Sequence, residues 1–416
     1  MRQIYTSLDI GSDSIKIVVC ELYQNKLNLL ACSSYKAKGI KKGLITDVKS
    51  ATESIRNAID SVQNMIGVTI NKVIATIPSY FAEFTVKKAE INIMAQSVTH
   101  SDVRNILDSI TLDNLSDDKE IVSILPVDFK VDDVTGIKNP LEIEGKVLGV
   151  RTIVVTTEKK YIYSVVGLLE NMGLEVIDTS ITGIGDYATH KTKSTENGIC
   201  SIINIGSDIT NVALYNKGII LKNSVISMGG KNINKDIAYM YKTDNDTAEN
   251  LKKTFALGHK RKASTTDMIK IKTDYDDDLK INQYEISEIV SSRLEEILNL
   301  AKKELNILTS RKIDYIIITG GTSNMADIEY IISDVFGSNA NIGNIKLIGI
   351  RDNKYSSCIG NIINFIDKLK LRGEEYTMIS NSAALRLSSV GNEYQGLNNV
   401  KMLEKMTEYF LANRRI

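Results

Sequence analysis

A glycine-containing turn near the start of the chain carries the first side chains that could bind an anion. The segment SLDIGSDSIK, residues 7–16, joins two β-prone runs, which predicts a hairpin with its turn at residues 11–14. Gly11 lets the backbone approach a bound group, and converging N–H groups in such a turn, with the hydroxyls of Ser12 and Ser14, suit phosphate. Asp9 could hold Mg²⁺ through water, because Mg²⁺ prefers one or two carboxylates together with phosphate oxygens. An ordinary hairpin has the same local pattern, so both interpretations stay open for this turn alone.

Two more isoleucine-rich strands lead into glycine turns, at residues 202–215 (IINIGSDITNVALY) and 315–324 (YIIITGGTSN). Three such junctions, two of them hairpins, indicate two related halves that close on one nucleotide. The distance between them in the sequence is too large for a short-repeat solenoid. Gly229 and Gly230 start a predicted helix, whose free N–H groups would point at an anion.

The composition limits the class of protein. A chain of 416 residues can bury two cores of ordinary domain size. Lys and Arg total 51, as do Asp and Glu, a balance that argues against nucleic acid as the main partner and favours self-association. Cys20, Cys32, Cys200 and Cys358 are scattered without a CxxC pair, as expected for reduced core residues. We find neither a signal peptide nor a bilayer-spanning apolar run, so we expect a soluble cytoplasmic protein.

The first predicted half is a mixed α/β unit. Apolar residues recur at three- and four-residue steps over residues 48–66, with Asp47 placed to cap this helix and Gly67 to end it. A strand is predicted at residues 72–77, after the hairpin and the helix. Further elements of the same core are a helix over residues 162–172 and a strand over residues 174–178.

Residues 83–157 read as a separate inserted unit. Thr99 and Asp102 form a capping box ahead of a short amphipathic helix. Strands are predicted at residues 121–125, 129–131 and 147–156. The insert holds no grouping of His, Cys or paired carboxylates beside a glycine loop, so we expect it to make contacts rather than to do chemistry.

A polar segment, residues 191–197, is predicted to be the hinge before the second half. The acidic cluster of Asp274 and residues 276–278 lacks EF-hand spacing and is typical of a solvated hairpin turn. The other predicted elements are strands at residues 199–204, 212–215, 219–226 and 313–319, and helices at residues 248–255, 285–308, 326–336 and 357–369.

The C-terminal region changes character twice. Residues 372–398 have few bulky apolar side chains and no clear period, which predicts a flexible linker. Residues 399–416 fit an amphipathic helix in a membrane interface, although Glu404 and Glu408 weaken the pattern, and the alternative is a helix docked on another protein. The apolar face and the cationic positions are formed by Val400, Leu403, Met406 and Phe410, and by Lys401, Lys405, Arg414 and Arg415.

With these motifs in order, the chain resembles the FtsA family of bacterial cell-division proteins, within the actin superfamily, from about residue 5 to residue 366. SLDIGSDSIKIVV resembles the first phosphate loop of the family, and residues 38–59 resemble the segment after it. TGIKNPLEIEGKVLGVRTIVVT lies where FtsA carries its extra subdomain, and residues 228–255 resemble the family's Gly-Gly, DIA and AExxK run. IITGGTSNM resembles the adenosine motif, and GIRDNKYSSCIGNII resembles its closing segment. A lone glycine loop is unspecific, whereas this ordered set is specific.

The resemblance implies an α/β fold, the actin-like two-domain ATPase fold with ribonuclease H-like halves and the FtsA-type inserted subdomain. The first half would comprise residues 1–82 and 158–190, and the insert residues 83–157. The second half would comprise residues 191–371, with a smaller subdomain at about 233–284. The linker (372–398) and a membrane-targeting helix (399–416) would follow.

The resemblance also implies an ATP site between the halves. The phosphates would lie between residues 11–13 and 206–208, close to Lys16, with Asp9 as the ligand of Mg²⁺. The glycine pair 229–230 would pass near the nucleotide. The cofactor-binding set is Gly11, Ser12, Asp13, Lys16, Gly206, Ser207, Asp208, Gly229 and Gly230, with Glu249 and Lys252 flanking the ribose or base and Gly320, Gly321 and Met325 on the adenosine side.

Three positions depart from the family pattern. Asn204 stands where the family's second loop usually has an aspartate, and a neutral amide neither holds a Mg²⁺–water network nor accepts a proton as a carboxylate does. Asp208 would restore a charge nearby but would repel phosphate, and Asp327 stands where the adenosine motif usually has a glycine. With Asp9, Asn204 and Asp208 as the candidate catalytic residues, we expect ATP binding with weak ATPase activity at most.

The implied partners are those of a cell-division actin. The protein would polymerise head to tail on the cytoplasmic face of the cell membrane at the division site. It would tether FtsZ there through the FtsZ C-terminal peptide, on the smaller subdomain of the second half. Two alternatives stay open within the superfamily: a non-hydrolysing scaffold or adaptor, and a small-molecule kinase. Asn204 and the predicted tail favour the scaffold over the kinase.

Overall fold

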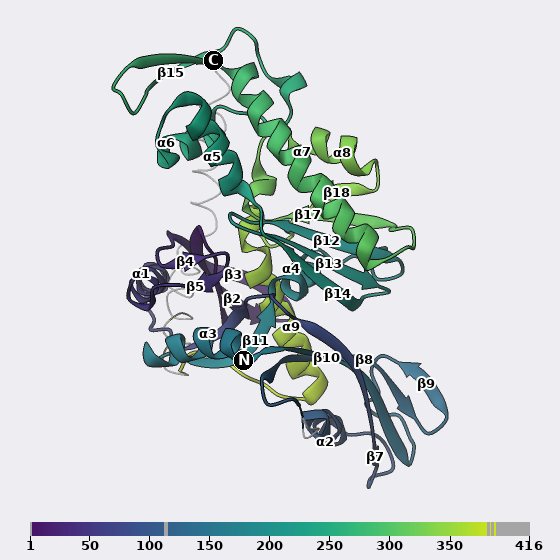
Figure 1. Ribbon diagram of the computed structural model, residues 1–416. Helices are drawn as coiled ribbons and strands as arrows, with labels where there is room; N and C mark the ends of the chain where they lie inside the picture. Colours follow the sequence, from purple (N-terminus) through teal and green to yellow (C-terminus); the bar gives the residue numbers. More distant parts are fainter. Residues whose placement is uncertain (1, 112–114, 381–382, 384–386, 388–416) are drawn as a thin grey trace, which may run out of the picture.

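The two halves of the molecule are each built on a five-stranded sheet. In this computed structural model residues 2–111, 115–380, 383 and 387 are described (Figure 1). The first sheet has the strand order β11-β6-β1-β2-β3 and the second has β14-β13-β12-β17-β18. In both, three antiparallel strands are joined to two parallel ones. The strands are β1 (Gln3–Ile10), β2 (Ser14–Tyr23), β3 (Lys26–Lys36), β6 (Lys72–Ile77) and β11 (Glu175–Ile181), then β12 (Ile199–Ile205), β13 (Thr210–Asn216), β14 (Ile219–Ile226), β17 (Tyr315–Thr319) and β18 (Ala340–Ile342). The matching topology confirms two related halves.

The helices of the first half follow from caps and apolar spacing. Helix α1 (Val48–Ile66) begins at Asp47, whose carboxylate accepts the backbone N–H groups of Lys49 and Ser50, and ends at Gly67 with φ 67°. Its buried face packs into the core beneath β3. Two further helices, α3 (Lys159–Asn171) and α4 (Thr182–His190), follow the insert, and a small hairpin, β4 (Ile40–Lys41) and β5 (Leu44–Ile45), precedes α1. The sequence predicted α1 and α3 but not α4.

The second half adds helices and a second hairpin above its sheet (Figure 1). Its helices are α5 (Gly230–Tyr241), α6 (Asn245–Thr254), α7 (Gln283–Leu308) and α8 (Ile328–Phe336), with short 3₁₀ turns at Lys260–Lys262, Gly321–Asn324 and Asn353–Tyr355. The hairpin consists of β15 (Met268–Lys272) and β16 (Asp278–Asn282). The acidic cluster lies at its exposed turn, which confirms the predicted solvated hairpin.

The insert is a four-stranded antiparallel sheet, β7-β10-β8-β9, with one helix against it. It extends away from the two halves at the lower right of Figure 1. The predicted capping box is present, since the backbone N–H of Thr99 donates to Asp102 at 2.9 Å. The prediction of separate strands at 121–125 and 129–131 was wrong, because one strand continues through Pro126 with a shifted register. The elements are β7 (Glu83–Asn92), α2 (His100–Thr111), β8 (Lys119–Val131), β9 (Val134–Ile137) and β10 (Val147–Glu158).

Helix α9 (Ser356–Arg372) joins the halves. The sequence placed it in the second half, 191–371, but its apolar face packs on β1, β2 and β6 of the first half. It crosses α4 with almost no side chain between them: a Cβ on Gly360 would lie 1.6 Å from the carbonyl oxygen of Gly185. The sequence boundary is therefore wrong for this helix, because burial of its apolar stripe, and not chain order, decides where it packs.

The chain after α9 stays attached to the first half. The backbone N–H of Met378 donates to the carbonyl of Ile4 at 2.8 Å, and Met378 is buried among residues of β1 and α9. The prediction of a flexible linker over residues 372–398 is therefore wrong for the part up to residue 380, which packs on the first half. The predicted tail, residues 399–416, lies outside the described residues, and among those described no helix is long and apolar enough to span a membrane.

Candidate functional site

A cleft of about 790 Å³ lies between the two halves. The β1–β2 turn borders it from the first half, and the β12–β13 turn, α5, α6 and the 3₁₀ turn after β17 border it from the second. The structure thereby brings together residues that are up to 345 positions apart, from Asp9 to Lys354. Of the predicted site residues in the two halves, only Gly229 does not line the cleft; those that do are Asp9, Gly11, Ser12, Asp13, Lys16, Asn204, Gly206, Ser207, Asp208, Gly230, Glu249, Lys252, Gly320, Gly321 and Met325.

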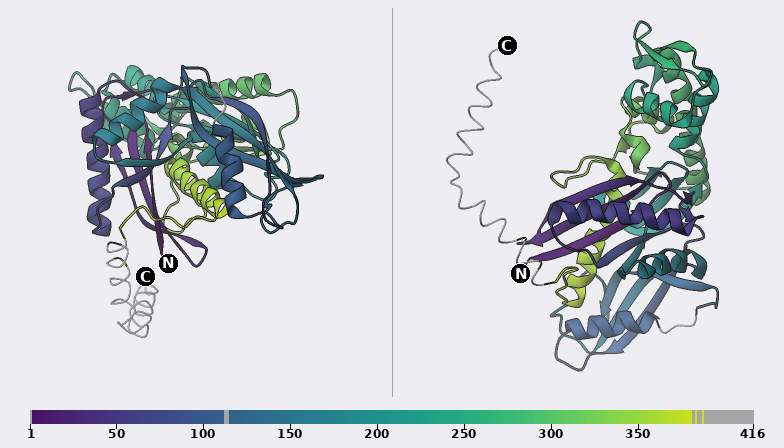
Figure 2. Two further views of the ribbon diagram at one scale, coloured as in Figure 1. Left: turned by 90° about the horizontal axis from the view of Figure 1, so that it is seen from below. Right: turned by 90° about the vertical axis from the view of Figure 1, so that its left-hand side faces the viewer.

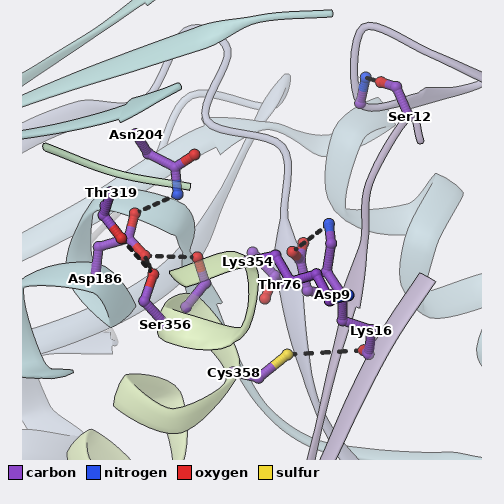
Figure 3. Close-up of polar contacts among 12 residues, drawn as sticks. Asp9, Ser12, Lys16, Thr76, Asp186, Asn204, Thr319, Lys354, Ser356 and Cys358 are labelled. Carbon is purple, nitrogen blue, oxygen red and sulfur yellow. Dashed lines mark hydrogen bonds and ion pairs between the residues drawn. The ribbon is translucent and has the colours of Figure 1, made fainter. Parts of the chain in front are cut away.

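In the first turn, Asp9 and Lys16 are paired. They are opposite residues in the β1–β2 register, and the Lys16 ammonium donates to the Asp9 carboxylate at 3.1 Å (Figure 3). Burial alone would lower the pKa of Lys16, but the Asp9 carboxylate outweighs it and the pKa is raised. A Cβ on Gly11 would lie 2.4 Å from the Lys16 Nζ, so glycine leaves the room that this lysine occupies.

The second turn is held by the start of α5. The N–H groups of Gly230 and Lys231 donate to the carbonyls of Gly206 and Ser207, at 2.9 and 2.8 Å. The prediction that free N–H groups at this helix start point at an anion is therefore wrong, because the turn itself satisfies them. Gly229 lies beneath the turn, where a Cβ would approach the Ser207 carbonyl oxygen to 2.6 Å.

A buried carboxylate that the sequence analysis missed lies behind Asn204. The Asn204 side-chain amide donates to Asp186 of α4 at 2.7 Å, and the hydroxyls of Ser356 and Ser357 donate to the same carboxylate (Figure 3). Burial raises the pKa of Asp186 to about 6, against these hydrogen bonds, which lower it. One acidic residue among apolar and glycine neighbours in 182–190 was the available signal. Position 204 thus keeps a carboxylate partner, although its own side chain is neutral.

Residues of the second half form a further wall of the cleft. The Lys252 ammonium donates to the Gly230 carbonyl at 3.1 Å, and burial lowers the pKa of Lys252 to about 8. Glu249 pairs with Lys253. The backbone of Gly320 has φ 91°, and its Cβ position is 2.4 Å from the Asn204 side-chain oxygen. These contacts fix the wall on which a base or sugar could lie.

Asp327 follows this wall and has φ 59°. A residue in this left-handed region usually is glycine, and aspartate is one of the few others tolerated there. The departure noted in the sequence is therefore compatible with the local backbone, and α8 begins at Ile328 rather than at the predicted residue 326.

The lining fits a polar, phosphate-bearing ligand. Among the described residues, the Ser207 hydroxyl and the Asn234 side-chain oxygen are buried in this lining without a hydrogen-bond partner. Because buried polar atoms are nearly always satisfied, the Ser207 hydroxyl and the Asn234 oxygen indicate a missing polar partner. Residues 11 and 206 are glycines for a different reason: a Cβ at either position would meet atoms of the turns that border the cleft. The described residues hold no cluster of three or more His, Cys, Asp or Glu side chains suited to a metal.

Comparisons with known proteins agree with this architecture. The family model described as cell division protein FtsA matches residues 201–360, and the one described as the SHS2 domain inserted in FTSA matches residues 82–156. The chain is similar to cell division protein FtsA of Enterococcus hirae, with 26% identity over 90% of this chain and 85% of the relative. It is also similar to that of Staphylococcus epidermidis, with 28% identity over 87% of this chain and 79% of the relative.

Solved structures with a similar fold are more distant in sequence. A PilM-PilN type IV pilus biogenesis complex aligns with a TM-score of 0.59 and 13% identity, over 86% of this chain and 98% of that one. MreB 5 of Spiroplasma citri bound to AMPPNP aligns with a TM-score of 0.52 and 14% identity, over 89% and 99%. At these identities the likeness concerns the fold, which is the actin-like ATPase fold that the sequence predicted. The two family models, the relatives along most of the chain and the inserted four-stranded unit together place this chain in the FtsA family of cell-division proteins.

Proposed function

We propose that this protein is an actin-like cell-division protein that binds Mg²⁺–ATP in the cleft and turns it over slowly. The observation that carries the proposal is the pair of hairpin turns, one from each half, that face one cleft lined by unpartnered polar atoms. MreB 5, which shares the fold, has been solved with AMPPNP. Membership of the FtsA family supports the cell-division role.

In this proposal each part of the cleft has a separate task. Asp9 would hold the magnesium ion through water, and the ion would neutralise phosphate charge when it is bound. Lys16 would lie near the phosphates, and Lys252 would face the nucleoside. The Asn204 side-chain amide donates a hydrogen bond to Asp186 and cannot act as a general base in the cleft. This favours a nucleotide-binding scaffold with slow turnover over a small-molecule kinase.

Replacing Asp9 with asparagine should weaken Mg²⁺-dependent ATP binding at least tenfold, because the amide loses the negative charge that attracts the ion. Asparagine still accepts a hydrogen bond from Lys16, so the buried lysine keeps a partner, which alanine would not provide. The measurement is calorimetric titration with ATP, in Mg²⁺ and in EDTA. Asp9→Asn that binds Mg²⁺–ATP as tightly as the wild type would contradict a role for Asp9 in holding the metal.

The cell-division role requires assembly at the membrane. We propose that copies associate head to tail through the insert, residues 83–157, and the second half. A contact between different surfaces that does not close into a ring gives an open filament. The filament would lie on the cytoplasmic face of the cell membrane at the division site, and the smaller subdomain of the second half would hold the C-terminal peptide of FtsZ. Residues 399–416 would supply the membrane contact.

The double variant Leu403→Glu and Phe410→Glu should release the protein from anionic vesicles. Each buried Leu or Phe side chain contributes roughly 1.5–3 kcal/mol, and each basic residue near the surface adds about 1 kcal/mol. One tail would therefore bind weakly, and stable attachment would need many tails on one filament. The measurement is vesicle co-pelleting with and without ATP.

A matched control for this charge change is Val48→Glu with Met65→Glu, two exposed side chains of α1 in the first half, which is not part of the proposed filament contact. The control should pellet as the wild type does, and both double variants should bind ATP normally. If the tail variant pellets as well as the control, the tail is not the anchor.

A further inference from the structure

Two turns are proposed to hold the phosphates, residues 11–14 and 206–209, and we call them the phosphate turns. Asp208 lies in the second of them and faces the first half of the molecule. Its side chain is only 15% exposed, and its carboxylate accepts the backbone N–H of Lys42 at 2.9 Å and pairs with the Lys231 ammonium at 3.3 Å. Burial alone would raise the pKa of Asp208, but the Lys42 N–H and the Lys231 charge outweigh burial and the pKa is lowered. The group is therefore ionised, inside the cleft, at the end where phosphates would lie.

The partners of Asp208 are the kinds of group that bind phosphate oxygens. Lys42 and Gly43 form the tip of the β4–β5 hairpin, and both have positive φ, 51° and 76°. Their N–H groups bond to the two turns: that of Lys42 donates to Asp208, and that of Gly43 donates to the Ser12 hydroxyl at 2.7 Å. The sequence analysis did not place this hairpin at the site.

Lys231 completes the arrangement from the second half. Its ammonium also donates to the Ser12 carbonyl at 3.1 Å, so it spans both phosphate turns. One carboxylate therefore engages a backbone donor of the first half and a cation that contacts both halves. These donors converge on Asp208 and not on open space.

We propose that the Asp208 carboxylate is a built-in competitor of the ligand's phosphate groups, which a phosphate-bearing ligand must displace from Lys42 and Lys231 in order to bind. The inference rests on the proposed function of the cleft and adds a residue that sets its affinity. Six lysines and six carboxylates, Asp208 among them, line the cleft, so its formal charge is balanced. A polyanion that enters without a cation meets no excess of positive charge, and Asp208 is the carboxylate that holds the Lys231 ammonium and the Lys42 N–H.

The test compares metal-free polyanions with metal-bound ATP. Asp208→Asn keeps an acceptor for the Lys42 N–H but removes the charge, and we expect it to bind ATP in EDTA, and inorganic tripolyphosphate, at least tenfold more tightly than the wild type. Mg²⁺–ATP should gain less, because the ion already offsets part of the repulsion. Lys231→Gln should weaken binding of both polyanions. The readout is calorimetric titration, which does not depend on turnover.

Asp276→Asn is the matched control. Asp276 also pairs with a lysine, Lys272 at 2.6 Å, but it lies in the turn of the β15–β16 hairpin outside the cleft lining, and its side chain is 82% exposed, so solvent screens its charge. This variant should bind as the wild type does. Equal affinity of Asp208→Asn and wild type overturns the inference alone, and so does a loss of Mg²⁺–ATP affinity, which would make Asp208 a metal-holding group. If the wild type, Asp208→Asn and Asp276→Asn all fail to bind the polyanions and Mg²⁺–ATP, the proposed function is overturned as well.

Discussion

Replacing Gly360 with alanine should lower the free energy of unfolding by about 3 kcal/mol, the upper end of what overpacking usually costs. The added methyl would lie 1.6 Å from the backbone oxygen of Gly185, where no side-chain rotation can relieve the contact. Helices α4 and α9 would have to separate, and this would draw Asp186 away from its two serine partners. Urea unfolding measures the loss.

The control for this substitution is Gly167→Ala in α3. A Cβ at Gly167 meets nothing within 4 Å, so the exchange should stabilise the protein by up to about 1 kcal/mol through helix propensity alone. A Gly360→Ala protein that unfolds at the same urea concentration as the wild type would mean that the two helices do not pack backbone to backbone.

The substitution Asp186→Asn should become more destabilising as the pH falls from 7 to 4, by on the order of 3 kcal/mol. Burial raises the pKa of Asp186 from 3.8 to about 6 in the folded protein. A raised carboxyl pKa contributes stability that is fully present below the unfolded value and is lost as the pH rises through about 6. Asparagine lacks this contribution, so its penalty is larger in acid.

A second buried group has the opposite dependence. Burial lowers the pKa of His190 from 6.5 to about 4. The contribution of this histidine to the free energy of unfolding is therefore present above pH 6.5 and is lost as the pH falls toward 4. The penalty of His190→Gln should therefore shrink in acid, by a similar amount, and the double variant should follow the wild-type pH profile. Unfolding curves at several pH values test this. A penalty of Asp186→Asn that stays constant between pH 4 and 7 would show that this carboxyl does not change its protonation there.

The sequence predicted the elements whose signals are local. The two hairpins were predictable because β-prone runs flank their turns, and α1 because Asp47 caps a regular apolar face. The residues of both turns that border the cleft were predicted for the same reason. Local patterns also explain why the insert was recognised as a unit, although its longest strand, β8, was divided at Pro126.

What the sequence did not predict depends on contacts between distant segments. Asp186 meets Asn204, 18 residues away, and Ser356, 170 residues away, and neither spacing leaves a periodic signal. Helix α4 was missed because it has only nine residues, two of which are glycines, and its few apolar side chains form no periodic pattern. The Lys42–Gly43 turn reaches the cleft through hydrogen bonds to Ser12, 31 residues away, and to Asp208, 166 residues away, so no local rule could place it there.

The attachment of residues 373–380 to the first half has a mechanical consequence. Beyond α9 the chain passes beside the start of β1, where Met378 and Thr377 bond to the backbone of Ile4. In the second view of Figure 2 this corner lies at the edge of the first half, away from the second. A force that pulls on the chain beyond residue 380 is therefore borne by β1 and α9. The end of β1 carries Asp9, which lines the cleft, and α9 begins at the serines that bind Asp186. One strand and one helix therefore connect the point of load directly to the cleft.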